Sequence, residues 1–395
     1  MHWPIAFVQL FFTLGWTVYV IFLPGLLKRA GIDAAWLPWI LIVDQLLFAA
    51  ADLATGLWLD RSERLLRMAG NVLTALVLAA CVVFMLLPFL AETMPPWLFV
   101  PALFIWVICS SVLRVPPLVL LGKYATPRPP AGMRSPVAAY LFGIGVAGAI
   151  APYLTVLLKN RDPLLPFVLA SVALAVTTMV LRRELVKRAP AAPPATPSTA
   201  AGRLPIALPL LIAVGLFAFG AQIHAAVNSA RLFARVAPGV PLEWLMPLFW
   251  AGFSVAMFPA SRWLARATQH GGHPHASATA LWLAGLIGGI ALVACATAPP
   301  LPLLIVLQIV AGGAWAVVFL AALAAAAELG RSGREDGWID ATLALFALAT
   351  AGRIVLVLLL SPGNIIAGQL SWLTGVLWLL GAAVLTLLYS RRNEG

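Results

Sequence analysis

Residues 69–90 read AGNVLTALVLAACVVFMLLPFL, an apolar run without a charged side chain. A helix of about 20 such residues crosses the hydrocarbon core of a bilayer. Each run of this kind is continuously apolar and lacks the alternation of a barrel strand, so the sequence predicts an all-α integral membrane protein with twelve transmembrane helices. The predicted spans are 4–27, 36–59, 69–90, 97–121, 135–158, 163–182, 205–230, 244–266, 277–297, 302–328, 338–361 and 367–390.

The composition excludes a water-soluble domain. Hydrophobic residues make up 62% of the 395 residues and charged residues 10%, against roughly 45–50% and 25% in soluble proteins. Cys81, Cys109 and Cys295 all lie in predicted spans, and they show neither a readable disulfide nor metal-ligand spacing. The chain also has no Gly-rich phosphate loop followed by Lys and Ser or Thr. We therefore expect no cofactor, no metal site and no nucleotide-driven step.

The net charge of +11 is a topology signal and does not indicate nucleic-acid binding. Of the 25 Lys and Arg residues, 17 fall in one set of alternate loops and tails, and 6 fall in the opposite set. Because basic loops stay in the cytoplasm, the majority set places both termini and the middle linker there. The minority set comprises Lys28, Arg29, Lys159, Arg161, Arg231 and Arg235. We expect the membrane to be a bacterial cytoplasmic (inner) membrane, with the first span retained rather than cleaved as a signal peptide.

A central linker divides the chain into two halves of six spans. Residues 183–204 (RELVKRAPAAPPATPSTAAGRL) are charged and then rich in Pro and Ala, which is typical of a tether. The predicted domains are therefore 1–182, a cytoplasmic linker at 183–204, and 205–395. The halves echo each other faintly, since GLWLDR at 56–61 corresponds to SRWLAR at 261–266. Internal duplication of this kind is common in transporters.

The stretch 52–67, DLATGLWLDRSERLLR, resembles the loop between helices two and three of the major facilitator superfamily (MFS). The resemblance covers essentially the whole chain and implies two pseudo-symmetric six-helix bundles. The family's usual second Gly is replaced here by Ser62 or Glu63. The resemblance implies that this loop grips the start of helix eleven when the inner gate is closed, with Arg61 and Arg64 paired to Asp340 or Asp336. The implied gating residues are Asp52, Gly56, Asp60, Arg61, Arg64, Arg67 and Asp340. In the alternative interpretation, the three arginines only fix the topology.

Other family patterns are present in altered form. Arg114 lies where many proton-coupled members carry an Arg, but Pro116 and Pro117 follow it. The fifth span has Gly143, Gly145 and Gly148 before Pro152, which is similar to the Gly/Pro run of many antiporters and favours export. A sodium site of the melibiose-transporter type is not supported, because Phe48 stands one turn before Asp52 where a second Asp is needed.

Four charged residues stand out at membrane depth within the predicted spans, namely Asp44, Asp52, Arg114 and Arg353. Such groups are costly in a membrane and therefore need a partner or a task. Asp44 and Arg353 each lie 8 residues from the outer ends of spans two and eleven, which are neighbours in the implied fold. We therefore expect an Asp44–Arg353 pair that forms or breaks as the halves move. Arg114 either pairs with Asp52 or faces the cavity, and both arginines have a purely structural alternative as links between helices.

Polar residues also mark spans one and seven, which line the central cavity in the implied fold. Gln9, Thr13 and Trp16 form a helical stripe in span one, with Tyr19 one turn further. In span seven His224 and Asn228 share a face, whereas Gln222 points elsewhere, and His224 is a candidate proton carrier. The alternative for each is a hydrogen bond between helices. His270, His273 and His275 lie in a Gly- and Pro-containing loop, and we interpret them as a solvated turn rather than a metal site.

These observations predict a secondary active transporter that moves a small organic solute by alternating access, coupled to protons and with export favoured. The candidate substrate- and ion-coupling residues are Asp44, Arg114, Arg353, His224, Gln222, Asn228, Thr13 and Trp16. The expected partners are the solute, the proton and the lipid bilayer, with no nucleic acid, and the chain is expected to act as a monomer. The alternatives are a proton- or cation-coupled importer of an anionic or zwitterionic nutrient, a membrane-embedded enzyme, and a non-transporting receptor. The enzyme is disfavoured because the intramembrane acids are few and scattered.

Overall fold

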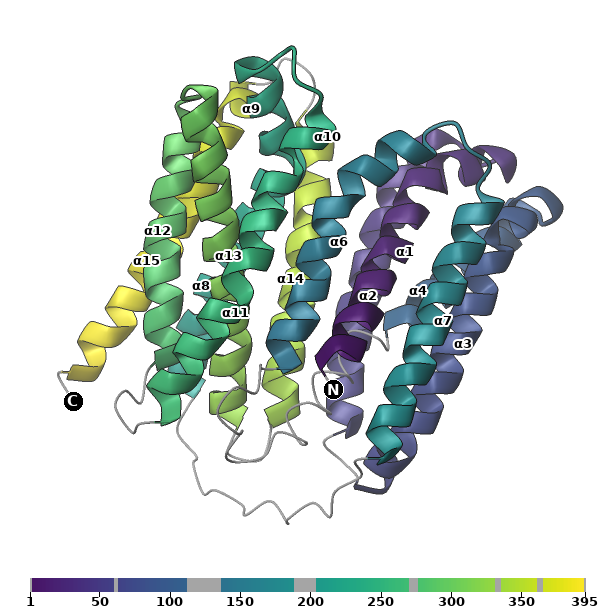
Figure 1. Ribbon diagram of the computed structural model, residues 1–395, viewed down its shortest axis with the longest axis horizontal. Helices are drawn as coiled ribbons and strands as arrows, with labels where there is room; N and C mark the ends of the chain where they lie inside the picture. Colours follow the sequence, from purple (N-terminus) through teal and green to yellow (C-terminus); the bar gives the residue numbers. More distant parts are fainter. Residues whose placement is uncertain are drawn as a thin grey trace. The chain divides into compact units, whose positions relative to one another are not determined.

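The computed structural model describes residues 2–59, 63–111, 136–187, 204–269, 276–330, 335–360 and 365–393, and over these ranges the regular structure is entirely helical (Figure 1). The chain divides into two compact units, Met1–Ala195 and Thr196–Gly395. The boundary falls within the linker predicted from the sequence. Each unit is described below by itself.

The described residues of the first unit form helices and one 3₁₀ turn. Its elements are α1 (His2–Arg29), the 3₁₀ turn η1 (Ala34–Trp36), α2 (Leu37–Leu59), α3 (Glu63–Thr93), α4 (Pro96–Ser111), α6 (Pro136–Leu158) and α7 (Leu164–Lys187). The second unit contains α8 (Leu204–Ile223), the π-helical turn η2 (His224–Asn228), α9 (Ser229–Val236), α10 (Leu242–Leu245), α11 (Pro247–Gln269), α12 (Ala276–Ala296), α13 (Leu301–Gly330), α14 (Glu335–Leu359) and α15 (Ile365–Asn393).

Eleven helices of the described residues are long and apolar enough to cross a membrane, and they coincide with eleven of the twelve predicted spans. The remaining span, 97–121, begins as the shorter apolar helix α4, and its second part lies outside the described residues. The protein is therefore a multi-pass integral membrane protein. Two details differ from the sequence-based prediction. α7 continues through Lys187, so residues 183–187 of the predicted linker are helical, and span seven continues to Val236 through a π-helical turn.

In the first unit α1 packs against both α6 and α7, and α3 packs against α4 and α7. The contact between α1 and α6 depends on Gly143, because a Cβ atom at this position would collide with the backbone carbonyl of Ala6. Small residues let two helices approach this closely in a membrane, where packing rather than the hydrophobic effect drives their association. One of the three glycines that we associated with export thus has a packing role.

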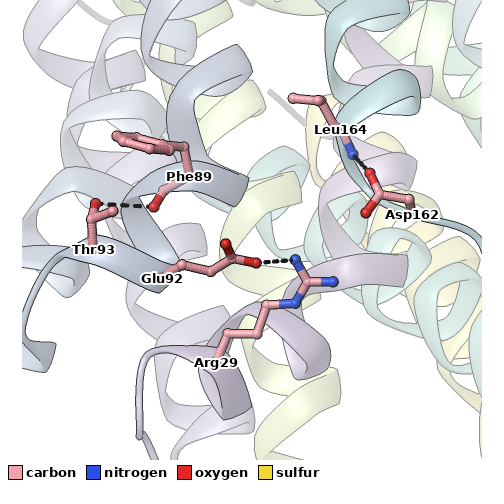
Figure 2. A network of polar contacts seen from close by, with 6 residues as sticks. All are labelled: Arg29, Phe89, Glu92, Thr93, Asp162 and Leu164. Atoms are coloured by element: carbon pink, nitrogen blue, oxygen red, sulfur yellow. Dashed lines mark hydrogen bonds and ion pairs between the residues drawn. The ribbon is translucent and has the colours of Figure 1, made fainter.

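At the end of the first unit that carries Lys28 and Arg29, polar contacts stabilise the ends of the helices (Figure 2). Arg29 at the end of α1 donates to Glu92 near the end of α3, with 2.7 Å between Nη1 and Oε1. Asp162 accepts a hydrogen bond from the backbone N–H of Leu164 at the start of α7. Both members of the ion pair are exposed, so the pair contributes no more than about 1 kcal/mol. Gly31 ends α1 in the left-handed conformation (φ 72°), and the next amide, of Ile32, bonds back to the Leu27 carbonyl at 2.8 Å.

In the second unit α13 packs against α11 and α12, and α15 packs against α8 and α12 (Figure 1). A Cβ atom on Gly252 would collide with the carbonyl of Ile309, and one on Gly312 would collide with the carbonyl of Phe249. This reciprocal pair of glycines brings the backbones of α11 and α13 into direct contact. Next to it, Trp378 fills the space left by Gly220 and Gly288, and its indole N–H donates to the Phe217 carbonyl at 2.8 Å.

The adjacent glycines of α13 provide a matched test of this packing. We expect Gly312→Ala to destabilise the protein by about 1–3 kcal/mol, because the methyl group overlaps the Phe249 backbone and the helices must separate. Gly313→Ala should be neutral or slightly stabilising, because its methyl group meets the Ala256 Cβ at 3.4 Å and the Gly252 carbonyl oxygen at 3.7 Å, which are ordinary contact distances, and alanine favours a helix. Thermal unfolding in detergent, followed by tryptophan fluorescence, compares the two. Equal melting temperatures for both variants would contradict the close contact.

Candidate functional site

The first unit holds a buried carboxylate between α1 and α2. Asp44 of α2 has 0% of its surface exposed, and its Oδ2 accepts a hydrogen bond from the hydroxyl of Tyr19 of α1 at 2.9 Å. Tyr19 is also 0% exposed. The second carboxylate oxygen, Oδ1, has no hydrogen-bond partner among the described residues. The structure therefore gives Asp44 a partner that the sequence analysis did not assign to it.

Aromatic rings surround this pair. The rings of Tyr19 and Trp106 lie 4.6 Å apart between centroids, and those of Trp16 and Tyr19 lie 5.1 Å apart. Trp16 also stacks on Trp106 at an interplanar angle of 11° and packs edge-on against Phe48, with 5.1 Å between centroids. The cluster continues through Phe84, which stacks on Trp106. α1, α2, α3 and α4 thus each supply a ring to the aromatic cluster next to the Tyr19–Asp44 pair.

Among the described residues of the first unit, no lysine or arginine forms an ion pair with Asp44. A carboxylate taken out of water without a compensating charge is strongly disfavoured relative to the neutral acid. Binding a proton removes that cost without moving any helix. The arrangement is therefore suited chemically to taking up and releasing a proton.

The predicted stripe on α1 is present. The Gln9 amide nitrogen lies 3.4 Å from the Thr13 hydroxyl, and Gln9 is buried, whereas Thr13 and Trp16 are half-buried. The Gln9 amide oxygen has no partner among the described residues. The hydrogen bond between Gln9 and Thr13 therefore lies within α1 and does not join two helices. Asp52 lies two turns after Asp44 on α2 and is completely buried.

In the second unit two of the polar residues of span seven, His224 and Asn228, lie on the π-helical turn η2. His224 begins this turn and Asn228 ends it, and both are buried. The turn is marked by a hydrogen bond from the Ser229 backbone amide to the His224 carbonyl, five residues back. Asn228 donates to the Leu370 carbonyl of α15 at 2.8 Å. π-helical turns are uncommon and occur frequently at functional sites.

Gln308 of α13 completes this cluster and was not among the residues that we selected from the sequence. Its Oε1 lies 3.0 Å from Nε2 of His224 and 3.4 Å from the Ser229 hydroxyl, and Gln308 is 0% exposed. Because an amide oxygen only accepts, this contact places the ring hydrogen on Nε2. The amide nitrogen of Gln308 has no partner among the described residues. An amide within the otherwise apolar run 302–327 was the signal available in the sequence.

The other predicted residues are placed apart from these two clusters or outside the described residues. Gln222 is half-buried and lies on α8, six residues before Asn228. Arg353 of α14 is half-buried and its buried Nε has no partner among the described residues, whereas Asp340 of the same helix is completely buried. Arg114, Asp60 and Arg61, together with the histidines at 270–275, lie outside the described residues.

Comparisons with known proteins were made for the sequence and for the structure. No protein-family model matches the sequence, and no curated protein matches it. Among solved structures, a bacterial homologue of the iron transporter ferroportin in an outward-facing state aligns with a TM-score of 0.69 at 15% identity, covering 98% of each chain. The human organic anion transporter MFSD10 (TETRAN) aligns with a TM-score of 0.68 at 15% identity, covering 97% of this chain and 98% of its own. A POT family transporter in complex with a thioalcohol-conjugated peptide aligns at 0.64 and 12% identity, covering 99% and 96%.

The chain has the fold of the major facilitator superfamily. This confirms the predicted fold class and the resemblance found in residues 52–67. Within the MFS fold, Gly56 lies on α2, and Arg64 and Arg67 lie on the first turns of α3. The pairing of these arginines with Asp340 or Asp336 joins the two units and stays a prediction, as does the Asp44–Arg353 pair. The Asp52–Arg114 pair involves a residue outside the described ranges and also stays a prediction.

Gln308→Leu tests the cluster at the π-helical turn. The substitution removes the acceptor that His224 and Ser229 share, and a buried donor left unsatisfied costs about 1–3 kcal/mol. We therefore expect a clear loss of thermal stability in the purified protein. Gln222→Leu is the matched control, because Gln222 is half-buried and the same change should leave the melting temperature nearly unchanged. A Gln308→Leu protein as stable as the control would show that the turn does not depend on this amide.

Proposed function

We propose that the protein is a secondary active transporter that carries a small organic solute across a bacterial cytoplasmic membrane by alternating access, coupled to the movement of protons. The observation that carries this proposal is the Asp44 carboxylate, which is completely buried, accepts a hydrogen bond from the Tyr19 hydroxyl, and forms no ion pair with a described residue of the first unit. The fold supplies the coarser part, since the solved proteins that share it are described as transporters.

The coupling argument follows from the energetics of a buried acid. A ligand shifts a conformational equilibrium only as far as its affinity differs between the two states. A proton on Asp44 changes the charge of a group that is fully desolvated in the described conformation. The affinity of the Asp44 carboxylate for a proton therefore differs between this conformation and any conformation in which water reaches it. Asp44 therefore has the property that a coupling residue requires. His224 is a second candidate, although its ring already bonds to Gln308.

The solute is proposed to be small, organic and partly apolar. Trp16 and Trp106 offer aromatic surface beside Asp44, and Gln9, Asn228 and Gln308 offer buried amides in the two units. Buried polar atoms without a protein partner, such as Nε2 of Gln308 and Oε1 of Gln9, are positions for a polar atom of the solute or for ordered water. Arg353, half-buried and with Nε unpartnered among the described residues, supports the alternative of an anionic or zwitterionic solute taken up by symport.

Direction and orientation rest on sequence patterns. Gly145, Gly148 and Pro152 of α6 support export, whereas Gly143 is explained by its contact with Ala6. The excess of Lys and Arg in alternate loops supports cytoplasmic termini. The chain is proposed to act as a monomer. An enzyme is not favoured, because the solved proteins of this fold named above are transporters.

Transport in proteoliposomes tests the proposal. We expect Asp44→Asn to abolish accumulation driven by an imposed pH gradient while solute counterflow continues, because the neutral amide keeps the shape but binds no proton. The solutes tested in this assay should include organic anions, organic cations and short peptides. Asp33→Asn is the control, since Asp33 is exposed, caps η1 through its side chain, and asparagine can still cap. Asp44→Asn protein that accumulates solute like the unmodified protein would refute the coupling role.

Tyr19→Phe tests whether the hydroxyl acts through Asp44. Loss of a hydrogen bond to a charged group is worth about 1.5–3 kcal/mol, so we expect the rate of gradient-driven transport to fall about tenfold or more. In the Asp44→Asn background, where solute counterflow is the remaining readout, the same change should leave the counterflow rate nearly unchanged, because the pair then no longer acts as a unit. A large further loss of counterflow in the double variant would mean that Tyr19 acts independently of Asp44. Tyr153→Phe, at an exposed position of α6, controls for loss of a phenol.

A further inference from the structure

The second unit contains an apolar groove between α11 and α12, with α13 as its floor. Its volume is about 480 Å³, and it is lined mainly by small side chains of the three helices, with Trp263 and Ile287 at its sides. Ala256, Ala260, Ala284, Gly313 and Ala314 leave the space open because none of them extends beyond a methyl group. α11 and α12 each pack closely on α13 (Figure 1) but have little contact with each other, which keeps the groove open along its length.

The dimensions of the groove match a lipid chain in one leaflet. Along α11 the lining residues run from Ala256, near the middle of the helix, to Trp263, six residues before its end. Along α12 they run from Ile287 back to Ala280, near the start of that helix. Seven residues of helix span about 10 Å, and the hydrocarbon of one leaflet is about 15 Å thick. The groove thus covers about 10 of the 15 Å of one leaflet, from near the middle of α11 to within two turns of its end.

Cationic side chains lie at the end of the groove where a lipid head group would be. Arg262 and Arg266 follow the lining residue Pro259 at three and seven residues, so they share its edge of α11, and both are exposed. Trp263 is 48% exposed between them. Tryptophan at head-group depth is typical of a membrane interface, and long Arg side chains reach from the helix surface towards phosphate. No residue that lines the groove in the described part of the chain is acidic.

We propose that this groove is a binding site for an anionic phospholipid. One acyl chain lies along α13 between α11 and α12, and the phosphate and the anionic head group lie against Arg262 and Arg266. Each basic residue near an anionic lipid surface favours binding by about fivefold. The site belongs to the second unit alone and is independent of the Asp44 region, so it holds whatever the solute and coupling ion are.

Native mass spectrometry of the purified full-length protein tests the proposal, with phosphatidylglycerol or phosphatidylcholine of identical chains added to the detergent. We expect phosphatidylglycerol to be retained preferentially. Arg262→Gln should reduce that preference about fivefold, whereas Arg235→Gln, which removes an exposed arginine from α9, should not. Equal retention of both lipids by the unmodified protein, or an equal effect of the two Arg variants, would overturn the head-group assignment.

A second pair of variants tests the acyl chain. Ala260→Phe places a ring in the groove and should abolish lipid retention, and Val255→Phe places the same ring on an outward position of α11 that is 75% exposed and outside the groove. Thermal unfolding without added lipid shows whether both variants fold. Retention of lipid by a folded Ala260→Phe protein at the level of Val255→Phe would place the lipid elsewhere and refute the site. The readout is bound lipid, so neither result depends on whether the protein transports a solute.

Discussion

Hydrocarbon offers no hydrogen bonds, and this constraint governs the rest of the structure. Each backbone N–H and C=O must find a partner inside the chain, so the segments that cross the membrane are helices, and the described residues contain no other regular structure. Thr and Ser side chains within the helices follow the same rule by bonding back to carbonyls three or four residues earlier, as Thr177 and Ser254 do. Buried side chains that form hydrogen bonds to another helix depart from this pattern.

Two such departures stand out, one in each unit. In the first unit, the buried Asp44 carboxylate accepts a hydrogen bond from the Tyr19 hydroxyl, and the Tyr19 ring packs against Trp106. In the second, α8 opens into a π-helical turn that directs His224 towards Gln308 and Asn228 towards the backbone of α15. Both clusters join side chains on different helices. Both also leave one polar atom without a protein partner among the described residues, Oδ1 of Asp44 and Nε2 of Gln308. In a purely structural network each of these atoms would be expected to have a partner, which is why we relate both clusters to transport.

Elsewhere within each unit, the helices pack closely because their surfaces are complementary in shape. Glycine is placed where one helix backbone meets another, at Gly143 of α6 against α1 and at Gly252 and Gly312 between α11 and α13, and Trp378 fills the space left by Gly220 and Gly288. Where no large side chain faces them, small residues instead leave an open space. Along α11, α12 and α13 they leave a groove that lipid can enter, and the arginines at its end give that groove a preference for charge. The same residue types thus produce close packing in one place and a binding surface in another.

The sequence alone determined the solvent, the helical class, the positions of the spans to within a few residues and the fold family. Length and continuity of apolar runs are local properties, and a bilayer converts them directly into helices. It also identified Asp44, His224 and Asn228 as polar groups in apolar surroundings. What it did not provide was their partners. Tyr19 lies 25 residues from Asp44 and Gln308 lies 84 residues from His224, and no periodicity within one helix specifies the rotation of another helix that brings such groups together. The π-helical turn was likewise decided by tertiary structure, because the propensity of residues 224–228 is that of an ordinary helix and the bonds to α13 and α15 distinguish it. Sequence thus fixes what must be buried, and the packing of helices against each other decides which buried groups meet.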